Sequence, residues 1–269
     1  MTDASALLTE TTEDGILIAT INRPDKLNAL DLATMDLLTE AVIRFRDTPA
    51  LKVMLIRSTG RYFSAGADMK GGQRKISPTE QTASGIRENH RLNLNGMQQL
   101  WDEIEHIEKP FVVAHHATCV GGGLEMSLSC DFRLAAKSAS YAFPESLFGV
   151  LPASGGVSRL TRLCGPHWAR WLIMANKPVN ADKAMTMGLV HEVYPDETFE
   201  ADVMEFCHHL AKQNGEQMGA AKVAIELCAE LGRDSARHIE RMANSGLMLN
   251  PAYQEGIRRY MAGIGGKKG

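Results

Sequence analysis

The sequence has little that would place it in a specialised class of protein. It has no apolar run of membrane-spanning length, and its opening, MTDASALLTETTEDG, lacks both the basic start and the apolar core of a secretion signal. Its five cysteines include no Cys-x-x-Cys pair and lie mostly in apolar runs, which is typical of reduced thiols rather than of disulfides or metal ligands. We therefore expect a soluble globular protein in the cytoplasm, with no membrane partner.

An excess of charge of one sign is also absent. The 29 Lys and Arg residues nearly balance the 32 Asp and Glu residues, and the basic residues are scattered apart from short clusters. Nucleic acid is therefore not an expected partner. The sequence has neither a Gly-x-Ser-x-Gly elbow nor a P-loop lysine pattern, so nothing supports a serine hydrolase of that type or a P-loop nucleotidase.

Two histidine pairs, His115-His116 and His208-His209, do not predict a metal site. Adjacent side chains point to opposite faces of a strand and lie about 100° apart on a helix, so neither pair converges on one ion. We expect no metal.

Short apolar runs alternate with helical patterns over the first two-thirds of the chain. Strands are predicted at 15–24, 52–58 and 109–116, and helices at 31–49, capped by Asp31, and at 87–107. This alternation favours a layered α/β fold with ligand-binding loops at the strand ends. From about Glu200 the pattern is almost entirely helical, so we expect a core domain over 1–199 and a helical region over 200–269, packed against the core or a neighbouring subunit.

The segment GRYFSAGADMK, residues 60–70, contains a run of small side chains just after a predicted strand. Ser64, Ala65, Gly66 and Ala67 would let backbone N–H groups face a bound group at close range. An ordinary turn would show the same composition, so this segment alone does not decide between the two.

The segment HHATCVGGGLEMSLSCD, residues 115–131, leads from a strand through three glycines into a helix that begins near Gly123. The first amides of a helix have no intrahelical partner and carry the positive end of its dipole, so the N–H of Gly122 or Gly123 suits an anion or a developing oxyanion. The alternative is a tight turn without a ligand. Glu125 has its own alternative, because acidic residues are common in a first helical turn.

The third segment, FPESLFG, contains Glu145 in an apolar neighbourhood. Desolvation by side chains such as Phe143 and Phe148 would raise the pKa of this carboxyl group and suit it to proton transfer. An ion pair with Arg159 or Arg162 is the alternative. Taken together, the three segments can supply two amide donors for an oxyanion hole and two glutamates for a water and a proton, a combination that suits thioester chemistry.

At these residues the sequence resembles the crotonase superfamily, specifically the enoyl-CoA hydratases. The segments NRPDKLNAL, FSAGADMK, GGGLEMSLSCD, FPESLFGVLPASGG and RLTRLCG occur in the family's order, and the likeness runs over about 15–195. The resemblance implies an α/β fold of the crotonase type, a spiral of repeated β-β-α units that binds the CoA thioester. It also implies that the C-terminal helices build homotrimers, often paired into homohexamers.

The resemblance also implies roles for individual residues. Ala67 and Gly122 match the amides of the oxyanion hole, and Glu125 and Glu145 match the two catalytic glutamates. The positions that match the surroundings of the CoA adenine and phosphates are Lys26, Leu27, Ala29, Ala65, Asp68 and Met69.

Both glutamates are retained, which favours addition of water across the 2,3-double bond of a trans-2-enoyl-CoA. Glu125 would activate the water for attack at C3, and Glu145 would deliver a proton at C2. No cofactor is expected, since coenzyme A is part of the substrate. The alternatives are an enoyl-CoA isomerase or a hydratase-lyase of the same superfamily, which would depend more on Glu145, or a catalytically idle CoA-binding scaffold subunit.

Two regions depart from the family pattern or vary within it. The loop over 71–94 lies where acyl-chain selectivity is often set. The ending AGIGGKKG differs from the Lys-Arg-x-Pro-x-Phe-like tail of many relatives, so the resemblance does not extend to CoA contacts from such a tail.

Overall fold

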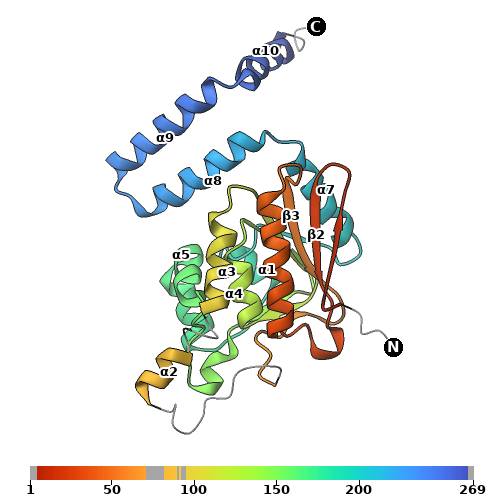
Figure 1. Ribbon diagram of the computed structural model, residues 1–269, viewed down its shortest axis with the longest axis vertical. Coiled ribbons are helices and arrows are strands. Elements are labelled where there is room, and N and C mark those ends of the chain that lie inside the picture. Colours follow the sequence, from red (N-terminus) through yellow and green to blue (C-terminus); the bar gives the residue numbers. More distant parts are fainter. Residues whose placement is uncertain (1–4, 71–81, 90, 92–94, 266–269) are drawn as a thin grey trace. The chain divides into compact units, whose positions relative to one another are not determined.

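The computed structural model describes residues 5–70, 82–89, 91 and 95–265 (Figure 1). The chain divides into two compact units, Met1–Ala211, which we call the core unit, and Lys212–Gly269, which we call the helical unit. Within the described residues, no helix is both long and apolar enough to cross a membrane.

The larger sheet of the core unit is mostly parallel. Its strands in the described part of the chain are, in spatial order, β1 (Leu7–Thr11), β2 (Ile16–Ile21), β3 (Val53–Ser58), β5 (Phe111–His115), β7 (Phe132–Ala136) and β10 (Glu192–Tyr194). Among the pairings that the structure describes in this sheet, only β1–β2 is antiparallel. Every residue of β2 and β5 is buried, as expected for a parallel sheet that is covered on both faces.

A smaller sheet is built from very short strands. They are, in spatial order, β4 (Tyr62–Ser64), β6 (Thr118–Val120), β8 (Ser140–Ala142) and β9 (Val179–Asn180). Strands β4, β6 and β8 are parallel and each follows a strand of the larger sheet along the chain, namely β3, β5 and β7. Helical segments follow each pair, which confirms the predicted repeat of β-β-α units.

The helices of the core unit cover the sheets and connect the strands. They are η1 (Pro24–Lys26), α1 (Leu32–Asp47), α2 (Ala83–Asn89), α3 (Asn95–His106), α4 (Gly122–Leu128), η4 (Pro144–Phe148), α5 (Gly156–Ala169), η5 (Arg170–Met174), α6 (Ala181–Thr186) and α7 (Phe199–Ala211). Helix α1 packs against β1 and β2, and helix α7 packs against β2, β3 and β7. The predicted cap of α1 is confirmed, since the Asp31 carboxylate accepts a hydrogen bond of 2.8 Å from the Thr34 N–H.

Several predicted elements differ from the observed ones. The helix expected over 87–107 is represented by α2 and α3, and residues 90 and 92–94 between them lie outside the described residues. The strand expected to end near His116 ends at His115, and the short strand β6 follows before α4 begins at Gly122. Strands of three residues are too short to show an alternating pattern, which explains why the sequence did not reveal them.

The core unit extends beyond the domain boundary expected at residues 199 and 200. Helix α7 belongs to it, because Phe199, Val203, Cys207 and Leu210 form an apolar stripe that is buried there. The helical unit comprises α8 (Gly215–Glu230), α9 (Arg233–Met248) and α10 (Pro251–Gly265). Its role in oligomerisation stays a prediction.

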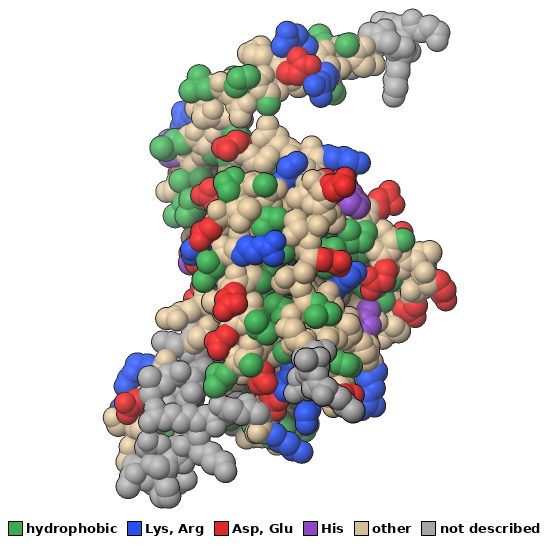
Figure 2. Space-filling model, turned by 45° about the vertical axis from the view of Figure 1, so that its right-hand side comes forward, with side chains coloured by type: hydrophobic (Ala, Val, Ile, Leu, Met, Phe, Trp, Pro, Cys, Tyr) green, Lys and Arg blue, Asp and Glu red, His purple; other side chains and the backbone are tan. Residues whose placement is uncertain are grey.

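The surface carries charges of both signs. In the view of Figure 2, Lys and Arg side chains are interspersed with Asp and Glu side chains, and no single basic area covers this face. This distribution agrees with the near balance of charges in the sequence.

Candidate active site

Two backbone amides from separate turns lie next to each other at the N-terminus of α4. The segment that carries Ala67 is fixed to residue 30, since the Leu30 N–H donates to the Gly66 carbonyl at 2.8 Å and the Asp68 N–H donates to the Leu30 carbonyl at 2.9 Å. A Cβ atom placed on Gly122 would lie 3.3 Å from the Ala67 nitrogen. Neither the Ala67 nor the Gly122 N–H donates a hydrogen bond within the part of the chain that the structure describes. Two such donors suit a single carbonyl oxygen.

Each glycine of the triplet makes room for a different neighbour. A Cβ on Gly121 would lie 2.9 Å from Glu145 Oε1, one on Gly122 would lie 3.0 Å from the Met97 methyl group, and one on Gly123 would collide with the Ser64 side chain. The triplet therefore has a packing reason in addition to the predicted access for a ligand.

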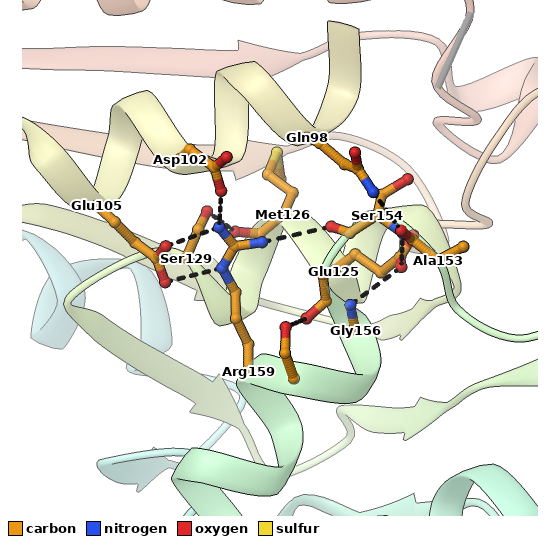
Figure 3. A network of polar contacts seen from close by, with 12 residues as sticks. Gln98, Asp102, Glu105, Glu125, Met126, Ser129, Ala153, Ser154, Gly156 and Arg159 are labelled. Carbon is orange, nitrogen blue, oxygen red and sulfur yellow. Dashed lines mark hydrogen bonds and ion pairs between the residues drawn. The ribbon is translucent and has the colours of Figure 1, made fainter. Parts of the chain in front are cut away.

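Glu125 is buried in the first turn of α4, with 4% of its surface exposed. Its Oε1 atom accepts hydrogen bonds from the N–H groups of Ser154 at 2.7 Å and Gly156 at 3.2 Å (Figure 3). Burial raises the pKa of Glu125 to about 7, against the opposing effect of the Ser154 hydrogen bond, and the nearby Glu145 raises it further. A preference of acidic residues for helix N-termini does not account for this burial. A carboxyl group with a pKa near neutrality can both accept and release a proton.

Glu145 lies in η4 and is partly buried. Burial raises the pKa of its carboxyl group, and its Oε2 atom is buried without a hydrogen-bond partner among the described residues. The alternative ion pair with Arg159 is wrong, because that guanidinium pairs with Asp102 and Glu105 instead. Glu145 is therefore the second desolvated carboxyl group beside the glycine triplet.

The predicted CoA-binding positions lie in two segments that meet close to Ala67, and they differ in exposure. The Ala65 N–H donates to the Leu27 carbonyl at 2.9 Å, which holds the two predicted segments together. Lys26 and Met69 are exposed, whereas Ala29 is buried. Asp68 forms an ion pair of 3.1 Å with Arg23, a residue to which the sequence analysis gave no role. Binding of CoA by these residues stays a prediction.

The turn from Ala153 to Gly156, which holds Glu125, was also given no role from the sequence. Its two consecutive glycines at the start of helix α5 were the available signal. Of the loop that was expected to set acyl selectivity, residues 71–81, 90 and 92–94 lie outside the described residues. In the described part of the chain, no group of three or more His, Cys, Asp or Glu residues is arranged to hold a metal ion.

Comparison with known proteins gives one consistent result. The sequence model of the enoyl-CoA hydratase/isomerase family matches residues 11–262. A crotonyl-CoA hydratase of Syntrophomonas wolfei is 31% identical over 250 residues, which cover 93% of this chain and 92% of that protein. A carnitinyl-CoA dehydratase of Salmonella enteritidis is 33% identical over 219 residues, covering 81% and 77% respectively. The crystal structure of an enoyl-CoA hydratase from Bacillus anthracis has a TM-score of 0.85 at 25% identity and covers 96% of each chain, which confirms the predicted fold class.

Proposed function

The chain belongs to the enoyl-CoA hydratase/isomerase family, and on this premise we propose that it adds water across the 2,3-double bond of a trans-2-enoyl-CoA. One observation carries the proposal. Two carboxyl groups with raised pKa values, Glu125 and Glu145, lie beside two backbone amides that have no partner in the described residues. The relatives named crotonyl-CoA hydratase and carnitinyl-CoA dehydratase support chemistry in which water is added or removed.

The proposed reaction uses each of these groups at one step. The thioester carbonyl oxygen accepts hydrogen bonds from the Ala67 and Gly122 N–H groups, which stabilise the negative charge of the enolate. The Glu125 carboxylate takes a proton from a water molecule while the water oxygen bonds to C3. Glu145, in its protonated form, gives its proton to C2. A following transfer of the proton from Glu125 to Glu145 through a new water molecule restores the starting state.

The remaining predicted roles belong to the same proposal. The two segments that carry Lys26, Leu27, Ala29, Ala65, Asp68 and Met69 would bind the adenine and phosphate part of CoA, because they meet close to the Ala67 amide. The helical unit would build a homotrimer or homohexamer.

The test is mass spectrometry of CoA esters after incubation of the purified protein with a panel of trans-2-enoyl-CoAs that includes crotonyl-CoA and an aromatic member. Gain of one water by any member is the expected result. An unchanged mass with a shifted double bond would replace the proposal with an isomerase. Binding of the esters without any reaction would replace it with an idle scaffold subunit.

A further inference from the structure

The turn that holds Glu125 is itself held by helix α3. The Ser154 and Gly156 N–H groups both point to Glu125 Oε1. The preceding carbonyl, of Ala153, accepts a hydrogen bond of 2.6 Å from the Gln98 side chain on α3 (Figure 3). The geometry of the turn therefore depends on a helix that is distant in sequence.

Arg159 connects the same turn to α3 through an ion-pair cluster in which the guanidinium is nearly buried and the Asp102 side chain is 55% exposed. The Arg159 side chain is 9% exposed and binds Glu105 through two parallel hydrogen bonds, Nε to Oε1 at 2.8 Å and Nη2 to Oε2 at 2.7 Å. Nη2 also lies 2.6 Å from Asp102 Oδ1, and Nη1 donates to the Ser154 carbonyl at 3.4 Å. Ser154 thus accepts a hydrogen bond from Arg159 and donates one to Glu125.

The two glycines of the turn show how closely it is packed against Arg159 and Glu125. A Cβ atom on Gly155 would collide with the Arg159 guanidinium, and one on Gly156 would lie 3.0 Å from Glu125 Oε1. The turn therefore lies between the guanidinium and the carboxylate, and its two glycines leave room for both groups.

The side chains of α3 that make these contacts share one face of the helix. Gln98, Asp102 and Glu105 follow the helical spacing of four and three residues. Met97 precedes Gln98 and lies about 100° from it around the helix, and its methyl group lies 3.0 Å from the Cβ position of Gly122. Adjacent faces of one helix therefore contact the turn of the oxyanion amides and the turn that holds Glu125.

A buried ion pair is weak evidence for a role in stability, because the loss of solvation opposes the attraction of the charges. An arginine fork fixes direction as well as distance, and here the fixed group is the turn that orients Glu125. We propose that Arg159, Asp102 and Glu105 are positioning residues for the Glu125 carboxylate, acting through the Ala153–Gly156 turn. This inference rests on the proposed function, in which Glu125 activates the water.

The principal test replaces Arg159 and follows the kinetics with an enoyl-CoA substrate. Arg159→Gln is expected to lower kcat about 10- to 100-fold, because small misplacements of a catalytic group have effects of this size, and to change KM less. The charged groups that act on Glu125 are Glu145 from η4 and Arg159 from α5. Since Arg159 favours the ionised form of Glu125, its removal should move the acid limb of the kcat/KM profile to higher pH. Arg159→Lys keeps the charge without the fork, so it should restore the pH limb more fully than kcat.

Two further variants make the result specific. Arg57→Gln is the matched control, because Arg57 also joins two carboxylates of the core unit, Glu10 and Glu200, and its loss should leave kcat and the pH profile unchanged. Glu105→Gln keeps the size of the side chain and should lower kcat in the same direction as Arg159→Gln. It carries the test if Arg159→Gln does not fold.

A double-mutant cycle separates positioning from general structural damage. In a Glu125→Gln background, Arg159→Gln should cause no further loss of kcat, because residues that act as one unit are not additive. A full additional loss, or a lower Tm of Arg159→Gln with unchanged kcat and pH profile, would overturn the inference.

A measurement without substrate tests the positioning role of Arg159 independently of the proposed function. The Glu125 carboxyl resonance, identified in ¹³C NMR by its absence from Glu125→Gln, should titrate at higher pH in Arg159→Gln than in the unmodified protein. Arg159→Lys keeps the charge without the fork, so it should show part of this shift if Arg159 acts through the turn and none of it if only the charge acts on Glu125. If the protein hydrates no enoyl-CoA and the shift is present in both variants, the proposed function fails and the positioning by Arg159 stands. If the resonance titrates identically in Arg159→Lys and in the unmodified protein, the positioning fails whatever the activity.

Discussion

The two halves of the candidate site are held together by different physical means. In the oxyanion half, backbone meets backbone, since Gly66 and the glycine triplet leave no side chains between the Ala67 and Gly122 amides. In the Glu125 half, charged side chains from α3 and α5 hold a turn against a buried carboxyl group. The first half therefore depends on steric fit, whereas the second also depends on protonation and ionic contacts.

The largest expected effect comes from removing the carboxylate of either glutamate of the site. Glu125→Gln and Glu145→Gln keep the size of the side chain but cannot exchange a proton, and each should lower kcat on the order of a hundredfold or more. The measurement is steady-state hydration of the best substrate in the panel. Glu40→Gln, at an exposed position on α1, is the control and should leave kcat unchanged. Turnover within a few-fold of the unmodified protein in either site variant would contradict the assigned roles.

The steric fit of the oxyanion half is tested by adding one methyl group. In Gly123→Ala the new Cβ would collide with Ser64, which is fully buried and whose hydroxyl accepts a hydrogen bond from the Gly66 N–H at 3.1 Å. We expect a loss of about 1–3 kcal/mol in the free energy of unfolding, measured by urea denaturation, because overpacking has this cost.

Gly96→Ala on α3 is the matched control, because no contact from the described part of the chain lies within 4 Å of the added atom. Alanine is the better helix former, so this variant should be as stable as the unmodified protein or slightly more stable. Equal stabilities of the two variants would show that close approach at Gly123 does not limit the fold.

The smallest expected effect is a dependence of activity on pH, which only the Glu125 half should produce. Burial raises the pKa of Glu125 to about 7, and the proposed reaction needs its ionised form. kcat/KM should therefore fall to about half of its plateau near pH 7 and continue to fall as the pH is lowered. The profile of kcat/KM against pH is the measurement, and an acid limb centred near pH 4.5 would contradict the assignment.

The raised pKa of Glu125 also makes the stability of the fold depend on pH, in the opposite direction from activity. Because the folded protein holds this proton more tightly than the unfolded chain, the free energy of unfolding should decrease as the pH rises from about 4.5 to about 7. Glu125→Gln removes that contribution.

The sequence by itself determined the features that depend on neighbouring residues. The alternation of apolar runs and helical patterns predicted the α/β class, and Asp31 predicted the start of α1. The small residues around Ala67 and the glycines before Glu125 indicated two turns with amides suited to a ligand. These signals are local, because periodicity and capping act within a few residues along the chain.

Only the tertiary structure decided which distant groups meet. The Ser154 and Gly156 amides that bind Glu125 lie 29 and 31 residues away from it in the sequence. Arg159 forms ion pairs with Asp102 and Glu105 rather than with Glu145. Packing also placed α7 in the core unit. The partners of a charged group and its desolvation depend on the positions of all surrounding elements, so no local sequence pattern predicts them. These two factors set the pKa of the Glu125 carboxyl group, on which the proposed chemistry depends.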